Sequence, residues 1–130
     1  MREAISRYSR NPIIGRIMKA IGRKVSFQYP EKHISGRLID RAIVESNPDR
    51  KVKDVPYWDV VDLIEFKKEE NPKWIRIGYY RVLKGDRLQW GSQTTIAEPV
   101  ETWKRILIEA ANQKPWFRDL LMSVAAELKK

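Results

Sequence analysis

Five short segments between residues 24 and 97 have the residue pattern of β-strands, and they constrain the fold more than any other feature of this chain. Val25 and Phe27, for example, alternate with polar neighbours, as expected for a strand with one buried face. Turn signals such as Pro30, a polar loop at 46–56 and Lys84-Gly85-Asp86 separate the segments. The predicted strands span residues 24–29, 34–44, 57–67, 73–82 and 87–96. Short strands joined by tight turns favour antiparallel pairing, so we expect a five-stranded antiparallel sheet or a partly closed barrel.

Helical segments flank these strands at both ends of the chain. Pro12 suits the first position of a helix that Gly22 would end. The apolar residues of this helix recur every four positions, at Ile13, Ile17 and Ile21. Pro99 and Pro115 suit the starts of two further helices, so the sequence predicts an α+β fold. We expect a single domain over residues 1–130, with a basic N-terminal helix (1–23), a β-meander (24–97) and a C-terminal helical pair (98–130).

Several classes of chemistry are excluded by composition. The chain has no cysteine, which excludes disulfides, thiolate metal sites and cysteine nucleophiles. Its one histidine, His33, falls in a predicted turn, so neither a histidine triad nor a multi-histidine metal site within one chain is expected. We therefore expect no catalytic residue, no metal and no cofactor. No apolar run of about 18 residues occurs, so no membrane partner is expected and a cytoplasmic location is the default interpretation.

The net charge of +9 is distributed unevenly along the chain. Residues 1–24 contain seven Lys and Arg residues against one acid, and residues 73–97 contain five against one. Such asymmetry suggests a polyanionic partner, or an acidic protein or membrane surface. The leading functional interpretation is a small basic module, without enzymatic activity, that binds DNA or RNA.

The fourth and fifth predicted strands provide the most specific candidate site. We expect Val82 to pair with Arg87, which would align Gly78 with Gly91 on one face of the sheet. The two glycines would floor a shallow slot whose aromatic, basic and amide walls suit single-stranded nucleic acid. The side chains expected to bind nucleic acid here are Trp74, Arg76, Tyr80, Arg87, Gln89 and Gln93. The alternative is that the glycines allow a helix to pack closely on the sheet.

The basic N-terminal segment provides a second candidate surface, because contact with backbone phosphates needs charge but little geometry. The residues expected to contribute to it are Arg7, Arg10, Arg16, Lys19, Arg23 and Lys24. The alternative is that these side chains form a solvated face of the molecule.

Two other functions also fit the sequence. The first is an accessory protein whose basic surface binds an acidic protein, with Trp116 and Phe117 as candidate anchors. The apolar face of the last helix also suits a homodimer, because three helices on a five-stranded sheet leave apolar surface uncovered.

The second alternative is a magnesium-dependent nuclease. Pro48-Asp49 and Glu65-Phe66-Lys67 together resemble the PD-(D/E)xK nuclease pattern, in which two acids hold a magnesium ion and a lysine assists the attacking water. The resemblance covers residues 48–67, with Asp59 as an alternative to Asp49. It departs from the pattern because Pro48-Asp49 lies in a predicted loop and a strand is expected after Lys67. A solvated, salt-bridged strand end would also explain Glu65 and Lys67.

Overall fold

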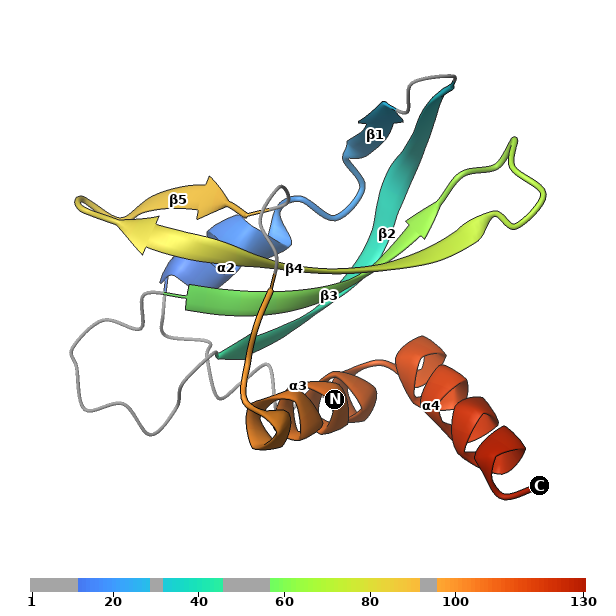
Figure 1. Cartoon of the computed structure of the whole chain (residues 1–130). Coiled ribbons are helices and arrows are strands. Elements are labelled where there is room, and N and C mark those ends of the chain that lie inside the picture. Colours follow the sequence, from blue (N-terminus) through green and yellow to red (C-terminus); the bar gives the residue numbers. More distant parts are fainter. Residues whose placement is uncertain (1–11, 29–31, 46–56, 92–95) are drawn as a thin grey trace.

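A strongly curved antiparallel sheet separates one helix from two others in the computed structural model (Figure 1). The structure describes residues 12–28, 32–45, 57–91 and 96–130. The strands are β1 (Lys24–Gln28), β2 (His33–Glu45), β3 (Tyr57–Glu65), β4 (Lys73–Leu83) and β5 (Arg87–Trp90). The helices are α2 (Pro12–Met18), α3 (Val100–Gln113) and α4 (Pro115–Leu128). The strands lie in the order of the chain and every neighbouring pair is antiparallel, which confirms the predicted α+β class.

Several element ends differ from the predicted bounds. α2 ends at Met18, and the chain reaches β1 through a turn in which Gly22 has a φ of +91°, a conformation that glycine adopts without strain. β3 ends at Glu65. The Phe66 N–H still bonds to the carbonyl of Pro72, but Pro72 has no N–H to return, and the Phe66 carbonyl accepts from the Glu69 N–H in the turn into β4. β5 ends at Trp90, and residues 92–95 of the predicted fifth strand lie outside the described residues.

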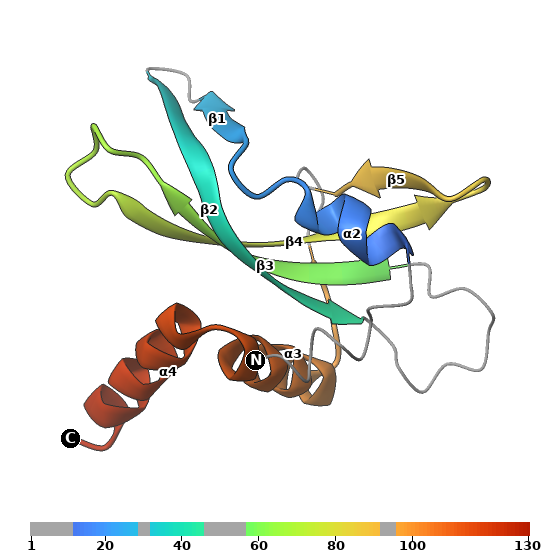
Figure 2. The same cartoon turned by 180° about the vertical axis from the view of Figure 1, so that it is seen from behind.

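The sheet is covered on both faces, because successive residues of a strand point to opposite sides. Figure 2 shows α2 on one side of β3 and the pair α3 and α4 on the other. The core beneath α2 is built from Ile14, Ile17, Ile43, Trp58 and Val60. The core beneath α3 and α4 is built from Ala42, Val44, Val61, Ile106, Ala110 and Phe117. A third apolar cluster, at the end of the sheet formed by β1, contains Ile34, Leu38, Ile64 and Phe66.

Helix α3 also caps the edge of β2 that β1 leaves uncovered. β1 pairs with β2 only as far as Arg37, so the main chain of Ile43 would otherwise present an open edge. The Gln113 side-chain amide takes the place of a neighbouring strand. Its oxygen accepts from the Ile43 N–H at 2.9 Å and its nitrogen donates to the Ile43 carbonyl at 2.6 Å. Arg105 donates to the Glu45 carbonyl at 2.8 Å, and such capping protects a sheet edge from pairing with another chain.

The predicted register of β4 against β5 is wrong by one residue. Leu83, not Val82, lies opposite Arg87, so the turn is shorter than expected; Gly85 and Asp86 take the positive φ angles that it needs. A shift of one residue exchanges the two faces of a strand. The side chains of Leu88 and Trp90 therefore point to the face of the sheet opposite to the one expected.

Candidate nucleic-acid interface

The predicted slot between β4 and β5 does not form, because aromatic rings cover both of its glycines. A Cβ atom at Gly78 would lie 2.3 Å from the Trp90 ring, and one at Gly91 would lie 2.4 Å from the Tyr79 ring. Each glycine therefore accommodates a ring from the neighbouring strand. The reason is the register, which places Trp90 directly opposite Tyr80.

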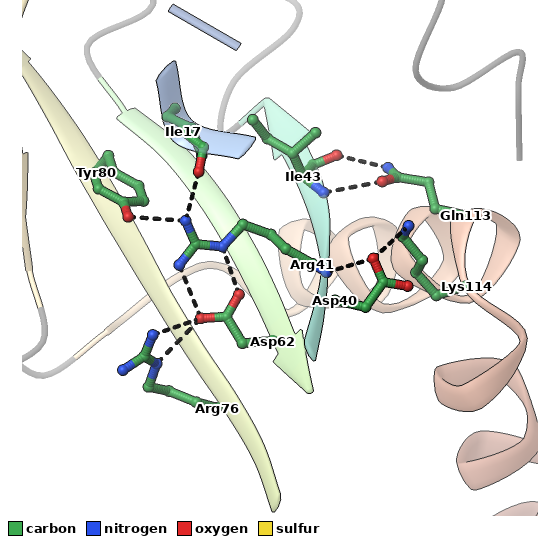
Figure 3. A network of polar contacts seen from close by, with 9 residues as sticks. All are labelled: Ile17, Asp40, Arg41, Ile43, Asp62, Arg76, Tyr80, Gln113 and Lys114. Atoms are coloured by element: carbon green, nitrogen blue, oxygen red, sulfur yellow. Dashed lines mark hydrogen bonds and ion pairs between the residues drawn. The ribbon is translucent and has the colours of Figure 1, made fainter. Parts of the chain in front are cut away.

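Arg76 and Tyr80 take part in a buried polar network (Figure 3). Its centre is Asp62, whose carboxylate accepts from Arg41 at 2.7 and 3.0 Å and from Arg76 at 2.9 and 3.1 Å. The same Arg41 guanidinium donates to the Tyr80 hydroxyl and to the carbonyl of Ile17, each at 2.8 Å. The network thus links three strands to the core-facing side of α2.

The centre of this network is shielded from solvent. Arg41 is 1% exposed and Asp62 is fully buried. Burial alone would lower the pKa of Arg41, but the hydrogen bonds and the charge of Asp62 outweigh it and hold that pKa above the usual value. The Arg76 guanidinium lies 4.7 Å from the centre of the Trp90 ring, a cation–π distance. The two arginines that meet at Asp62 therefore brace the core.

The other residues of the predicted slot are dispersed. The Trp74 indole donates to the Asn71 carbonyl at 2.6 Å and packs on the rings of Phe27 and Phe66. Arg87 and Gln89 are exposed on the solvent side of β5, so contact with nucleic acid remains a prediction for them. Gln93 lies outside the described residues.

The predicted N-terminal surface is brought together only in part. Arg7 and Arg10 lie outside the described residues. Arg16 donates a hydrogen bond to the carbonyl of Asp86, which ties α2 to the turn between β4 and β5. Lys19 and Arg23 are exposed, and Lys24 lies at the start of β1 beside a cleft that the sequence did not predict.

This cleft, called the basic cleft below, lies between β2 and the turn that joins β3 to β4, and it has a volume of about 670 Å³. It opens because β2 and β3 stop pairing at Arg37 and Glu65, after which the two hairpins diverge (Figure 1). Gly36 lies at the point of divergence. A Cβ atom there would come within 2.3 Å of the Glu65 carbonyl oxygen, so glycine is needed for this close approach.

Cations outnumber acids along this cleft. The basic side chains that line it are Lys24, Lys32, His33, Arg37, Lys67 and Lys68, and the acidic ones are Glu65 and Glu69. Both acids are already paired, Glu65 with Lys73 at 2.8 Å and Glu69 with Lys32 at 2.6 Å. The hydrogen bond from Lys73 holds the pKa of Glu65 below its usual value.

Four cations of the cleft have no ion-pair partner among the described residues: Lys24, Arg37, Lys67 and Lys68. Two of them, Lys24 and Arg37, are directly opposite each other in the pairing of β1 with β2. Side chains at opposed positions share a face of the sheet, and like charges placed there destabilise the pairing. The cleft is therefore a concave, positively charged surface suited to an anionic ligand.

Sequence reasoning missed Lys32, Arg37 and Lys68, and it considered Lys67 only as part of the nuclease pattern. The Lys67-Lys68 pair at a strand end and the alternation that places Arg37 on a face with Ser35 were visible signals. What the sequence did not give is the point at which β2 and β3 part, and only that point turns these residues into the lining of a cleft.

The structure does not bring together Asp59 and Glu65, the two acids of one form of the nuclease interpretation. Asp59 and Glu65 lie toward opposite ends of β3, and six residues of extended strand separate them by about 20 Å. Two carboxylates that bind one metal ion lie within a few ångströms of it, so these two cannot share one. Asp49 lies outside the described residues. Among those described, no three His, Cys, Asp or Glu side chains are grouped to hold a metal ion.

The predicted anchors for a protein partner are occupied within the chain. Phe117 is buried in the core beneath α3 and α4. The Trp116 indole donates to Asp40 at 3.0 Å. α4 nevertheless exposes several large apolar side chains, namely Leu120, Met122, Val124 and Leu128, and a homodimer through this helix stays a prediction.

Comparisons with protein-family models, with curated protein sequences and with solved structures found no match to this chain. None of the helices in the described ranges is both long and apolar enough to cross a membrane. The chemistry of the basic cleft is therefore the basis for a functional proposal.

Proposed function

We propose that this protein binds nucleic acid through the basic cleft. The observation that carries the proposal is the opposition of Lys24 and Arg37 within a cleft whose two acids are already ion-paired. Opposed cations weaken the fold, and a bound polyanion would remove that cost by neutralising both. Backbone phosphates are such a polyanion, since lysine and arginine contact them with little geometric demand.

The molecule also carries the long-range field that such a ligand requires. The net charge of +9 accelerates the encounter with any polyanion, and the cleft provides the local surface on which the ligand can settle. This charge supports a DNA or RNA ligand even though the predicted slot between β4 and β5 does not form. An acidic protein is the alternative partner, and the experiment below separates the two.

The experiment measures the affinity for labelled DNA and RNA by fluorescence anisotropy over a range of salt concentrations. Each phosphate contact contributes roughly −0.7 to −0.9 to the slope of log K against log salt. The test variant is Lys67→Glu/Lys68→Glu, which reverses two cleft charges on exposed side chains. The matched control is Lys129→Glu/Lys130→Glu, which changes the net charge equally at the exposed C-terminal end of α4.

We expect the cleft variant to bind about a hundredfold more weakly and with a slope reduced in magnitude by about two. The control should keep most of the wild-type affinity. Equal losses in both variants would contradict the proposal, because they would show dependence on net charge alone. Absence of binding at low salt would also contradict it and favour an acidic protein partner.

A further inference from the structure

Within the basic cleft, one edge of β2 has no neighbouring strand. The N–H and C=O of Leu38 bond to Arg23 and Gly22, on the side of β2 where β1 lies. Because these groups alternate sides along a strand, those of Ser35 and His33 point the opposite way, into the cleft. β3 does not reach them, since its pairing with β2 begins at Arg37.

This second edge differs from the one beneath α3. Gln113 caps the main chain of Ile43 with two hydrogen bonds. No side chain in the described part of the molecule caps the main chain of His33 or Ser35 in the same way. Open strand edges are usually protected, so an uncapped edge inside a charged cleft points to a ligand.

We propose that the basic cleft takes the unpaired bases of a single-stranded nucleic acid, with the main chain of His33 and Ser35 bonding to base edges. This inference rests on the proposed function and specifies its substrate class. In this arrangement the cations that line the cleft contact the phosphates, and the open edge of β2 contacts the bases.

The mixture of donors and acceptors in the cleft favours bases over phosphates as the groups that enter it. The main-chain carbonyls of the open edge can only accept hydrogen bonds, and its N–H groups can only donate them. A phosphodiester offers acceptors alone, whereas unpaired bases offer donors as well. Cations alone would suffice for phosphate.

The size of the cleft points the same way. A volume of about 670 Å³ lies in the range of sites that hold small molecules, and so it suits single bases. The bases of a duplex are paired with each other and cannot be extended into such a site. A peptide strand without negative charge is a poorer occupant, because it would leave the cations of the cleft unneutralised.

The test uses a proline substitution that removes one N–H from the open edge. In Ser35→Pro the missing N–H is the one that faces the cleft, so the pairing of β2 with β1 is retained. Ser26→Pro is the matched control. Ser26 lies directly opposite Ser35, and by the same alternation its N–H points away from both β2 and the cleft.

Both variants and the wild type are titrated by fluorescence anisotropy with a short single-stranded oligonucleotide and with its duplex. We expect the wild type to prefer the single strand by about tenfold or more. Ser35→Pro should lose about tenfold of the single-strand affinity and keep its duplex affinity, while Ser26→Pro should match the wild type. Circular dichroism and thermal melting establish that the variants are folded.

If Ser35→Pro does not fold, amide NMR signals of the wild type provide a second measurement. Titration with the single strand should shift the amides of Ser35 and His33 and leave that of Ser26 unchanged. Equal affinity for single strand and duplex, or unshifted Ser35 and His33 amides in the bound state, would overturn this inference while leaving the proposed function intact. Binding of an acidic peptide without binding of any oligonucleotide would overturn both.

Discussion

Two regions of this molecule contain arginines that lie in β-strands but have opposite surroundings. In the buried network, Arg41 and Arg76 converge on the carboxylate of Asp62. In the basic cleft, Arg37 lies opposite Lys24, and neither has an ion-pair partner in the described part of the chain. The comparison teaches that the role of a cation here depends on whether a carboxylate lies within reach. The network is a structural brace, and the cleft is left available for an external anion.

The largest expected effect comes from removing the shared carboxylate of the buried network. In Asp62→Asn, Arg41 and Arg76 would face each other without the charge that neutralises them. Removing one member of a buried ionic group costs about 3–5 kcal/mol. Urea denaturation should therefore show a large loss in the free energy of unfolding.

The control for this variant is Asp119→Asn, on the exposed side of α4, which should change stability by less than about 0.5 kcal/mol. A loss below about 1 kcal/mol for Asp62→Asn would show that the buried network is not the brace that the comparison requires.

An intermediate effect is expected where the β2 edge meets the start of α4. Burial alone would raise the pKa of Asp40, but hydrogen bonds from Trp116, Lys114 and the Arg41 N–H outweigh it and hold that pKa below its usual value. A carboxylate of this kind stabilises the fold above its unfolded pKa of about 3.9, and its contribution is lost as the pH falls through the lower folded value.

Stability should therefore decrease on acidification, and Asp40→Asn should remove about 1 kcal/mol or less of that decrease, since the group is partly exposed. Denaturation curves recorded between neutral pH and the strongly acidic range provide the measurement. An identical pH dependence in the wild type and Asp40→Asn would show that these hydrogen bonds do not stabilise the carboxylate.

The smallest expected effect is that of Lys24→Gln, which should raise the stability of the fold and lower its affinity for nucleic acid. Lys24→Gln removes the repulsion from Arg37, so the fold should be stabilised by a few tenths of a kcal/mol, roughly the cost of an opposed like-charge pair. Under the proposed function the same change would remove a phosphate contact and should weaken binding about uniformly across nucleic-acid sequences. Thermal melting and anisotropy together measure both signs. A loss of stability would contradict the idea that this pair is kept for a ligand.

Much of the fold follows from local patterns, and most of the site does not. Alternation from Val25 to Phe27 and the prolines at positions 12, 99 and 115 were sufficient for the elements and the fold class. The register of β4 against β5 depends on the length of the turn between them. The prediction made this turn one residue too long and therefore placed Trp90 on the wrong face of the sheet. The basic cleft depends on where two strands part after Arg37, a tertiary property that local periodicity does not contain.

The central claim is that the basic cleft binds nucleic acid and that the buried arginine network does not. The most direct test is the affinity of Arg76→Met for a single-stranded oligonucleotide, measured by anisotropy beside the wild type and Lys67→Glu/Lys68→Glu under conditions where all three are folded. The account predicts that Arg76→Met keeps wild-type affinity while the cleft variant loses about a hundredfold. Loss of affinity in Arg76→Met with retention in the cleft variant would contradict the account.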